Sequence, residues 1–327
     1  MQPFEYLRPD SIDAALRACD ARSKFIGGGT NLVDLMKSGV EHPQRLIDVT
    51  RLQLDRVEPL SNGGLRIGAG ARNSDVANDK AVRAQYPLLS EALLNGASPQ
   101  LRNLATVGGN LLQRTRCDYF VDPAFLHCNK RDPGSGCGAL RGYNRTHAIL
   151  GASEHCVAVN PSDMVVALLA LDAVVIARSA NGERRIALDD FHRLPGDHPE
   201  RDTNLAPGEL IVAVELPPSK FATHSRYLKV RERASYAFAL VSVAVGFDVA
   251  DGRIGDARIA LGSVAHKPWL AKEAAASLIG KTPGDIDFAA LTKTALAGAQ
   301  ALRQNAYKIP LAAKAIERAT RAALEAA

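Results

Sequence analysis

Residues 24–36 read KFIGGGTNLVDLM, and this stretch changes character twice within thirteen positions. The short run at 24–26 is typical of a β-strand, the glycines that follow indicate a turn, and residues 32–36 have the spacing of a helix. A second strand pattern, RLIDV, follows at 45–49. The stretch therefore predicts a compact βαβ-like unit with a glycine turn at the end of its first strand.

A second glycine turn is expected at 106–110, where the sequence reads TVGGN. Backbone N–H groups can approach a cofactor pyrophosphate only where no Cβ atom intervenes, and glycines at the end of a strand provide that space. In this turn Thr106 and Asn110 can add side-chain hydrogen bonds. Either turn alone fits a structural role better, but two such turns in one domain favour a cofactor site.

The remaining pattern alternates between strand and helix signals. At 327 residues the chain is too long for one simple core, so two or three subdomains are expected. Helices are expected at 11–21 (with Asp10 or Ser11 as N-cap), 86–96, 162–171 and 310–325, and strands at 65–70, 173–177, 210–216 and 237–249. A domain boundary is expected near 218–226.

The composition is that of an ordinary soluble globular protein, with 46% hydrophobic and 23% charged residues. The net charge of +5 comes from basic residues dispersed along the chain, so no nucleic-acid partner is expected. No apolar stretch is long enough to span a bilayer. The N-terminal sequence MQPFEYLRPDS lacks the basic and apolar regions of a secretory signal, which predicts synthesis in the cytosol without a signal of its own.

Five cysteines are present, and four of them, Cys117, Cys128, Cys137 and Cys156, fall within forty residues. Cys19 stands alone near the N-terminus and is interpreted as a small buried hydrophobe. A chain of this length without a signal does not depend on disulfides for its fold. The clustered thiols therefore indicate metal or redox chemistry.

The clustered cysteines are separated by ten, eight and eighteen residues. Structural zinc sites usually pair cysteines about two to four residues apart, so this spacing favours one [4Fe–4S] cluster but leaves zinc open. His127 and His155 stand beside cysteines and are alternative zinc ligands, although polar loop positions are the simpler interpretation.

The segment that carries these cysteines, residues 116–160, shows little periodicity, which predicts a long functional loop. Five basic side chains are expected to offset the negative charge of a thiolate-bound cluster, namely Arg114, Arg116, Lys130, Arg131 and Arg141. Three glycines are expected to let backbone N–H groups reach the sulfurs, namely Gly134, Gly136 and Gly138.

Two partial nucleotide motifs fail in detail. Residues 280–282 read GKT like the end of a P-loop, but Ala275 stands where the first glycine belongs. Residues 134–139 read GSGCGA, but they lie inside the cysteine segment rather than between a strand and a helix. Neither a P-loop enzyme nor a Rossmann dehydrogenase is supported.

Several motifs resemble those of the FAD-binding subunits of the xanthine dehydrogenase (molybdenum hydroxylase) family. They are FIGGGTNL at 25–32, TVGGNLLQ at 106–113, PSDM at 161–164 and YLKVRERASYAFALVSVA at 227–244. The resemblance covers essentially the whole chain. The cysteine motifs RTRC, CNKR and PGSGC are similar to those of the bacterial periplasmic aldehyde oxidoreductases, a branch in which this loop binds a [4Fe–4S] cluster.

The resemblance implies an α+β fold in two parts. A vanillyl-alcohol-oxidase (PCMH)-type FAD-binding domain would span residues 1–218, with subdomains of about 1–55 and 56–218 and an iron–sulfur loop at 114–160. A smaller α+β domain, like the C-terminal domain of the CO dehydrogenase flavoprotein, would span 222–327. FAD would lie between the two parts.

The resemblance also implies a set of site residues. The residues implied to bind FAD are Ile26, Gly27, Gly28, Gly29, Thr30, Asn31, Leu32, Val33, Thr106, Gly109, Asn110, Asp163, Ile211 and Lys229. The four clustered cysteines would be the cluster ligands, and no side chain is implied to be catalytic, because the chemistry belongs to the flavin. From the residues alone, Asp163 is equally a charge at a helix N-terminus and Lys229 a surface lysine.

The implied partners are a large molybdenum-cofactor subunit that oxidises aldehydes to carboxylic acids and a small subunit with two [2Fe–2S] clusters. In this heterotrimer, electrons would pass from the [2Fe–2S] clusters through FAD to an external acceptor. The complex would be exported to the periplasm on a signal of the small subunit, the alternative location being the cytoplasm. The alternative functions are a standalone flavin dehydrogenase or oxidase with a structural zinc loop, and a non-enzymatic scaffold.

Overall fold

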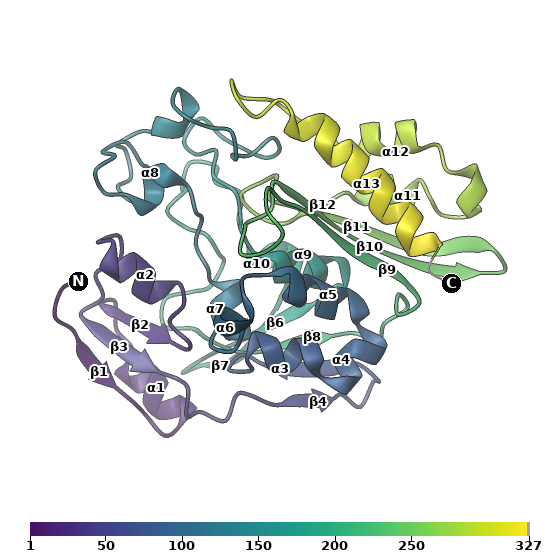
Figure 1. The fold of residues 1–327 in the computed structure, drawn as a ribbon. Coiled ribbons are helices and arrows are strands. Elements are labelled where there is room, and N and C mark those ends of the chain that lie inside the picture. Colours follow the sequence, from purple (N-terminus) through teal and green to yellow (C-terminus); the bar gives the residue numbers. More distant parts are fainter. Residues whose placement is uncertain (326–327) are drawn as a thin grey trace.

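The computed structural model describes residues 1–325, which fold around three β-sheets (Figure 1). The N-terminal sheet is parallel and has the order β1-β3-β2. Its elements are β1 (Glu5–Leu7), α1 (Ile12–Ala18), β2 (Ser23–Ile26), α2 (Leu32–Lys37) and β3 (Arg45–Asp48). The predicted βαβ unit is confirmed as β2-α2-β3, and Ser11 is the N-cap of α1, accepting a hydrogen bond from the Ala14 N–H.

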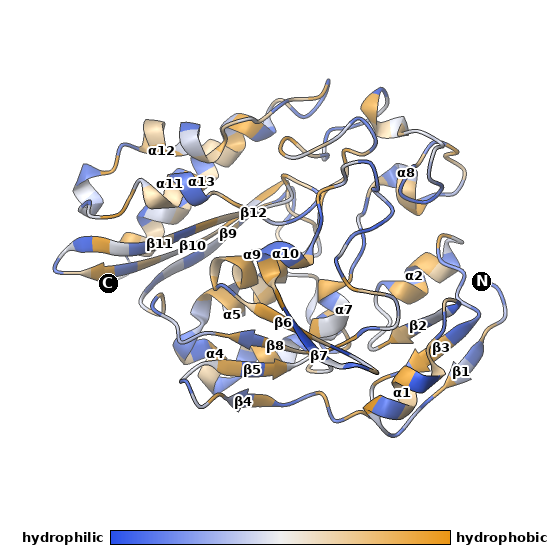
Figure 2. Cartoon of the chain, turned by 180° about the vertical axis from the view of Figure 1, so that it is seen from behind, coloured by the Kyte–Doolittle hydropathy of each residue, from blue (hydrophilic) through white to orange (hydrophobic). Residues whose placement is uncertain are grey.

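The central sheet is antiparallel and has the order β4-β5-β8-β6-β7. Its strands are β4 (Val57–Pro59), β5 (Leu65–Gly68), β6 (Val174–Ser179), β7 (Gly182–Ala187) and β8 (Leu210–Leu216). Every residue of β8 is buried, whereas β7 is an exposed edge, and Figure 2 shows the same contrast between hydrophobic and hydrophilic strands. The central position of β8 explains why its sequence, LIVAVEL, is almost continuously apolar.

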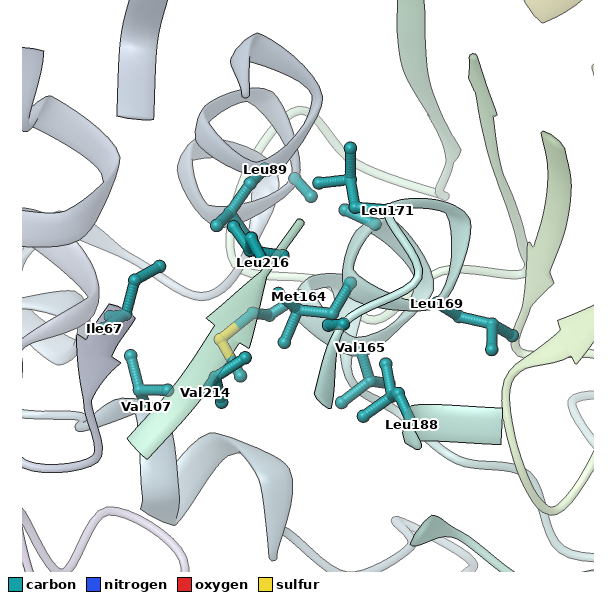
Figure 3. Close-up of a cluster of buried hydrophobic side chains, with 14 of the residues drawn as sticks. Ile67, Leu89, Val107, Met164, Val165, Leu169, Leu171, Leu188, Val214 and Leu216 are labelled. Carbon is teal, nitrogen blue, oxygen red and sulfur yellow. The ribbon is translucent and has the colours of Figure 1, made fainter. Parts of the chain in front are cut away.

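Helix α9 (Asp163–Ala170) is buried along its whole length and forms the centre of the main hydrophobic core. Figure 3 shows Met164 and Val165 of this helix beside Val214 and Leu216 of β8. A helix that is apolar on all sides must be covered on all sides, which the sequence DMVVALLA requires. The predicted capping by Ser162 is confirmed, because its hydroxyl accepts from the Val165 N–H.

A run of short helices connects β5 to the cysteine segment, and α10 (Leu188–Phe191) follows β7. The run comprises α3 (Asn73–Asn78), α4 (Lys80–Gln85), α5 (Pro87–Asn95), α6 (Pro99–Arg102) and α7 (Val107–Leu111). The second glycine turn, expected at 106–110, is in fact the start of a helix. Thr106 caps α7 by accepting from the Gly109 N–H at 3.2 Å, so its hydroxyl has a local structural role.

The C-terminal sheet is antiparallel, has the order β12-β11-β10-β9 and is covered by helices on one side (Figure 1). Its strands are β9 (His224–Val230), β10 (Val241–Ala250), β11 (Arg253–Gly262) and β12 (Trp269–Leu270). Its helices are α11 (Lys272–Ala276), α12 (Phe288–Ala295) and α13 (Lys308–Leu324), with a 3-10 turn at Pro283–Asp285. The strand expected at 237–249 begins only at Val241, since residues 237–240 belong to the connection from β9.

Between α7 and α9 the cysteine segment forms a mostly irregular lobe that lies above α2 in Figure 1. Its regular elements are a single helical turn, α8 (Asp118–Val121), and a 3-10 turn at Gly138–Leu140. The prediction of a long loop is therefore confirmed. None of the helices within residues 1–325 is long and apolar enough to cross a membrane.

Candidate functional site

The glycine turn after β2 is packed too closely against residues 104–106 to admit side chains. A Cβ atom on Gly28 would lie 1.9 Å from the carbonyl oxygen of Leu104, and one on Gly27 would lie 2.8 Å from Thr106 Oγ1. Gly29 adopts a φ of +71°, which favours glycine. Throughout residues 1–325 the N–H groups of residues 28–31 find no protein acceptor, so four adjacent donors are available to an anionic ligand.

Three segments that are far apart in sequence meet at this turn. The Arg114 N–H donates to Asn31 Oδ1 at 2.8 Å, which joins the glycine turn to the segment after α7. The Ser162 hydroxyl donates to Asn110 Oδ1 at 2.6 Å, which joins α7 to the start of α9. The Nδ2 atom of Asn31 is buried without a partner within residues 1–325, so this amide retains a free donor beside the glycines.

Asp163 and Lys229 form a buried ion pair between α9 and β9. Lys229 Nζ lies 2.7 Å from Asp163 Oδ2 and donates also to the Asn95 carbonyl, while the Tyr227 hydroxyl donates to Asp163 Oδ1 at 2.5 Å. The Lys229 side chain is only 1% exposed, so its interpretation as a surface lysine is wrong. Burial raises the pKa of the Asp163 carboxyl, and the Lys229 ammonium opposes that rise.

The apolar residues of the predicted FAD set occupy two places. Leu32 and Val33 form the first turn of α2, which begins after Asn31, and Ile26 ends β2. Ile211 lies instead in β8, 4% exposed, in the same hydrophobic core as Val107 of α7. The structure thus gathers the polar members of the set around the glycine turn and the start of α9, and it places Ile211 in the core beneath them.

The four clustered cysteines are free thiols brought together by contacts within the lobe. Cys128 and Cys137 face each other in an isolated antiparallel bridge. Cys117 and Cys128 share a small hydrophobic cluster that is shielded by Leu35 of α2. Asn129 Nδ2 donates to the His155 carbonyl at 3.0 Å, which holds the Cys156 end of the segment against the Cys128 end.

Two of these thiols have a pKa that is raised by burial and further by other thiols of the set. Burial raises the pKa of Cys117 to about 12, and the nearby thiols of Cys156 and Cys128 add to the rise. Burial likewise raises the pKa of Cys156 to about 11, with Cys137 and Cys128 adding and the Lys130 ammonium opposing. Within residues 1–325 no three His, Cys, Asp or Glu side chains are placed to hold one metal ion, whereas a cluster spreads its thiolate ligands over several irons. The donor set, four adjacent thiols without a disulfide, fits such a cluster.

The backbone N–H groups of the glycines in the lobe do not donate to the cysteine sulfurs as expected. The N–H groups of Gly134 and Gly136 donate to Asn129 Oδ1 at 3.1 and 2.7 Å, and the Gly138 N–H donates to the His127 carbonyl at 2.9 Å. These amides therefore shape the loop. A backbone donor to sulfur comes from Ala158, whose N–H lies 3.4 Å from the Cys156 Sγ.

Among the described residues, His127 and His155, the candidate zinc ligands, contact other polar groups and no cysteine sulfur. His127 Nδ1 lies 2.8 Å from the Ser135 carbonyl, and His155 Nε2 lies 3.5 Å from Asp197. A different histidine, His147, places its Nε2 atom 3.1 Å from the Cys117 Sγ. No local pattern marks this histidine, because His147 is thirty residues from that cysteine and adjacent to none.

Two of the basic side chains expected beside the cluster are instead engaged by carboxylates. Arg114 donates to Glu41 Oε1 at 2.7 Å and to Asp202 Oδ2 at 2.8 Å, and Lys130 Nζ lies 2.5 Å from Asp202 Oδ1. Their charges are thus largely balanced. Because Arg114 also donates through its backbone to Asn31, this network ties the cysteine lobe to the glycine turn.

Replacing Asp202 by asparagine is expected to lower the free energy of unfolding by on the order of 2 kcal/mol at neutral pH, since it leaves the buried Lys130 ammonium under-compensated. Lys130 and Arg114 overcome the cost of burial and hold the pKa of Asp202 well below its usual range. A depressed carboxyl pKa stabilises the fold above the unfolded value of about 3.9 and loses that effect as the pH falls below it. The difference in melting temperature between Asp202→Asn and the unaltered protein should therefore become smaller as the pH is lowered, which thermal melting at several pH values measures.

Asp197→Asn is the matched control, because Asp197 is 88% exposed on the same connection. It should melt like the unaltered protein at every pH. Equal melting temperatures for Asp202→Asn and Asp197→Asn at pH 7 would show that the network carries no stability.

Comparison with known families finds two matches that together span nearly the whole chain. Residues 2–219 match the model described as the FAD binding domain in molybdopterin dehydrogenase. Residues 226–323 match the model described as the CO dehydrogenase flavoprotein C-terminal domain.

Among curated proteins, the chain is 51% identical to the aldehyde oxidoreductase FAD-binding subunit PaoB of Escherichia coli K12, over 97% of this chain and 96% of that protein. It is 29% identical to the glyceraldehyde dehydrogenase medium chain of Sulfolobus acidocaldarius, over 86% of this chain and 83% of that protein. Both names describe one component of a multi-subunit oxidoreductase.

Among solved structures, a chain of the Cu,Mo-CO dehydrogenase in its cyanide-inactivated form matches with a TM-score of 0.76 at 23% identity, over the full length of both chains. A chain of carbon monoxide dehydrogenase from Hydrogenophaga pseudoflava matches with a TM-score of 0.74 at 25% identity, over 99% of this chain and 98% of that one. These likenesses confirm the predicted α+β fold.

Proposed function

Because the chain belongs to the family of FAD-binding subunits of molybdopterin dehydrogenases, we propose that it is the FAD- and [4Fe–4S]-carrying electron-transfer subunit of an aldehyde oxidoreductase. The observation that carries the cluster is the set of four free, adjacent thiols joined to the glycine turn through Arg114. The observation that supports an aldehyde as substrate of the whole enzyme is the identity to the Escherichia coli subunit over nearly all of both chains.

In this proposal FAD is held where three segments of the chain meet. The free N–H groups of residues 28–31 and the unpartnered Asn31 amide suit the pyrophosphate. The buried Asp163–Lys229 pair supplies a fixed polar group on the side of β9. The bound flavin supplies the electron-transfer chemistry, while the protein binds it, orients it and sets its surroundings.

The same proposal assigns the cluster to Cys117, Cys128, Cys137 and Cys156. Burial raises the pKa of the Cys117 and Cys156 thiols, so binding of iron to these two cysteines would release protons. A structural zinc ion on the same thiols, in a flavin enzyme that works alone, is the alternative, and metal analysis separates the two.

The proposed assembly also contains a large molybdenum-cofactor subunit and a small subunit with [2Fe–2S] clusters. The names of the relatives, FAD-binding subunit and medium chain, support a multi-subunit enzyme. In our proposal electrons arrive from the small subunit, pass through FAD and leave for an external acceptor. A periplasmic location, reached on a partner's signal, is part of the proposal and is tested by following the subunits in cell fractions.

The test is metal and flavin analysis of the intact complex, beside complexes that carry Cys137→Ser or Cys19→Ser. One cubane holds four irons, so Cys137→Ser should lose up to about four irons per complex. Cys19 lies at the end of α1, outside the lobe, so its variant should keep them all. Full iron in Cys137→Ser would show that the ligand set is wrong, and one zinc without cluster iron would support the standalone alternative.

A further inference from the structure

His147 contacts a proposed cluster ligand, Cys117, and this contact has no role in the function proposed above. Its Nε2 atom lies 3.1 Å from the Cys117 Sγ, and the residue is 3% exposed. Its other ring nitrogen, Nδ1, is buried and has no hydrogen-bond partner within residues 1–325. Among residues 1–325 the imidazole therefore has a single polar contact, and that contact is a cysteine sulfur.

The direction of this hydrogen bond follows from the two ring nitrogens. A thiolate bound to iron can only accept, so a hydrogen bond to it requires the proton on Nε2. The neutral tautomer with Nε2–H leaves a lone pair on Nδ1, and an unpaired buried acceptor costs less than an unpaired buried N–H. A protonated ring would place a second N–H at Nδ1 with no acceptor. The surroundings of His147 thus select the tautomer that donates to Cys117.

The backbone of His147 is held in place by the C-terminal helical region. Its carbonyl accepts from Lys308 Nζ at 2.9 Å and from Asn305 Nδ2 at 3.1 Å. Lys308 is fully buried at the start of α13 and donates also to the carbonyls of Thr146 and Ser263. Asn305 and Lys308, about 160 positions away in the sequence, therefore fix the histidine against the cysteine lobe, which is the arrangement expected of a preorganised donor.

We propose that His147 is a positioning residue for the iron–sulfur site, donating an Nε2–H hydrogen bond to the Cys117 thiolate that raises the reduction potential of the cluster. The inference rests on the proposed function, because it requires the cluster. A hydrogen bond draws negative charge from the sulfur, and the more reduced cluster is the more negative one. The bond therefore stabilises the reduced cluster more than the oxidised one.

The test is a redox titration of the cluster, followed by electron paramagnetic resonance in the intact complex, for His147→Leu and His147→Gln. Leucine removes the donor, so the midpoint should become more negative. We expect roughly a tenfold lower ratio of reduced to oxidised cluster at a fixed potential, which is about 59 mV for a one-electron couple. Glutamine keeps an N–H donor at the end of its side chain and should return the midpoint toward the original value.

His155→Gln is the matched control, since His155 is adjacent to Cys156 but bonds to no sulfur among the described residues. It should leave the midpoint unchanged. A further readout is an exchangeable proton coupled to the reduced cluster, present in the unaltered protein and absent from His147→Leu. An unchanged midpoint in a His147→Leu complex with full iron overturns the inference, as does a strong nitrogen coupling, which would make His147 a ligand. No cluster in the unaltered complex overturns the proposed function instead.

Discussion

Replacing Asp163 by asparagine is expected to lower the melting temperature by many degrees and to strip the protein of most of its flavin. The change keeps the size of the side chain and a hydrogen-bonding partner for Tyr227, but it removes the only carboxylate within salt-bridge distance of Lys229 among residues 1–325. The Lys229 ammonium would then be buried with the Asn95 carbonyl as its remaining acceptor. Breaking one side of a buried pair costs about 3–5 kcal/mol, more than most single substitutions.

A second acidic residue beside the same strand provides the control. Glu91 accepts from the Tyr227 N–H at 2.8 Å and pairs with Arg226, but its side chain is 33% exposed. Glu91→Gln should cost no more than about 1 kcal/mol and leave flavin bound, because exposed pairs are screened by water. Comparing Asp163→Asn with Glu91→Gln therefore shows whether the damage requires the loss of a buried carboxylate or follows from the loss of any carboxylate near β9.

The double variant Asp163→Asn with Lys229→Met removes both charges, and together with the single variant Lys229→Met it completes a thermodynamic cycle. If burial of an unpaired ammonium causes the damage, the double variant should melt at a higher temperature than Asp163→Asn alone. It should still bind flavin poorly, because the proposed polar group at the cofactor is gone. If the fall in melting temperature of the double variant equals the sum of the falls of the two single variants, Asp163 and Lys229 have no energetic link.

Local patterns in the sequence were sufficient for much of the fold. The unit β2-α2-β3 was predictable because strand, glycine turn and helix each leave a signal within a few residues. Helix α9 was predictable from a capping serine followed by an apolar run, and the buried strand β8 from its continuous hydrophobicity. The helical interpretation of 310–325 is also confirmed, since α13 spans Lys308–Leu324.

The contacts that organise the site were not predictable in the same way. Asp202 neutralises Lys130 and Arg114 across 72 and 88 positions of sequence, and no local pattern marks an acidic residue for such a partner. His147 lies beside Cys117, and its backbone is held there by Lys308 at the start of α13, about 160 positions away in the sequence. His127 and His155 stand out in the sequence because each is adjacent to a cysteine. Adjacency in sequence does not reveal which histidine lies near a cysteine sulfur in the folded protein.

The second glycine turn shows how one motif can serve two purposes. The residues TVGGN suggested a turn for a pyrophosphate, and the structure uses Thr106 to cap α7. The small glycines are still needed, because Gly108 packs against Ala69, where a Cβ atom would lie 3.2 Å from its carbonyl oxygen. Close packing and capping had the same sequence signature as ligand binding, so the residues alone could not separate them.

Replacing Gly28 by alanine is expected to abolish FAD binding and to destabilise the N-terminal part of the protein. The new Cβ atom would lie 1.9 Å from the Leu104 carbonyl oxygen and 2.7 Å from its carbon. These are backbone atoms, so no side-chain rotation can relieve the overlap, and the turn must move away from residues 104–106. Overpacking of this kind costs about 1–3 kcal/mol or more. The displacement would also open the contact between Gly27 and Thr106, and with it the proposed pyrophosphate site.

Gly255→Ala tests whether the close approach, rather than any loss of glycine, causes the effect. Gly255 lies in β11, its φ is not positive, and the nearest atom to an added Cβ is 3.8 Å away. This variant should bind flavin fully and melt at or slightly above the temperature of the unaltered protein, because alanine restricts the unfolded chain. Flavin absorbance and thermal melting of both variants complete the test. If Gly28→Ala retained full flavin at an unchanged melting temperature, the contact with Leu104 could not be part of the cofactor site, and the four free N–H groups would need another explanation.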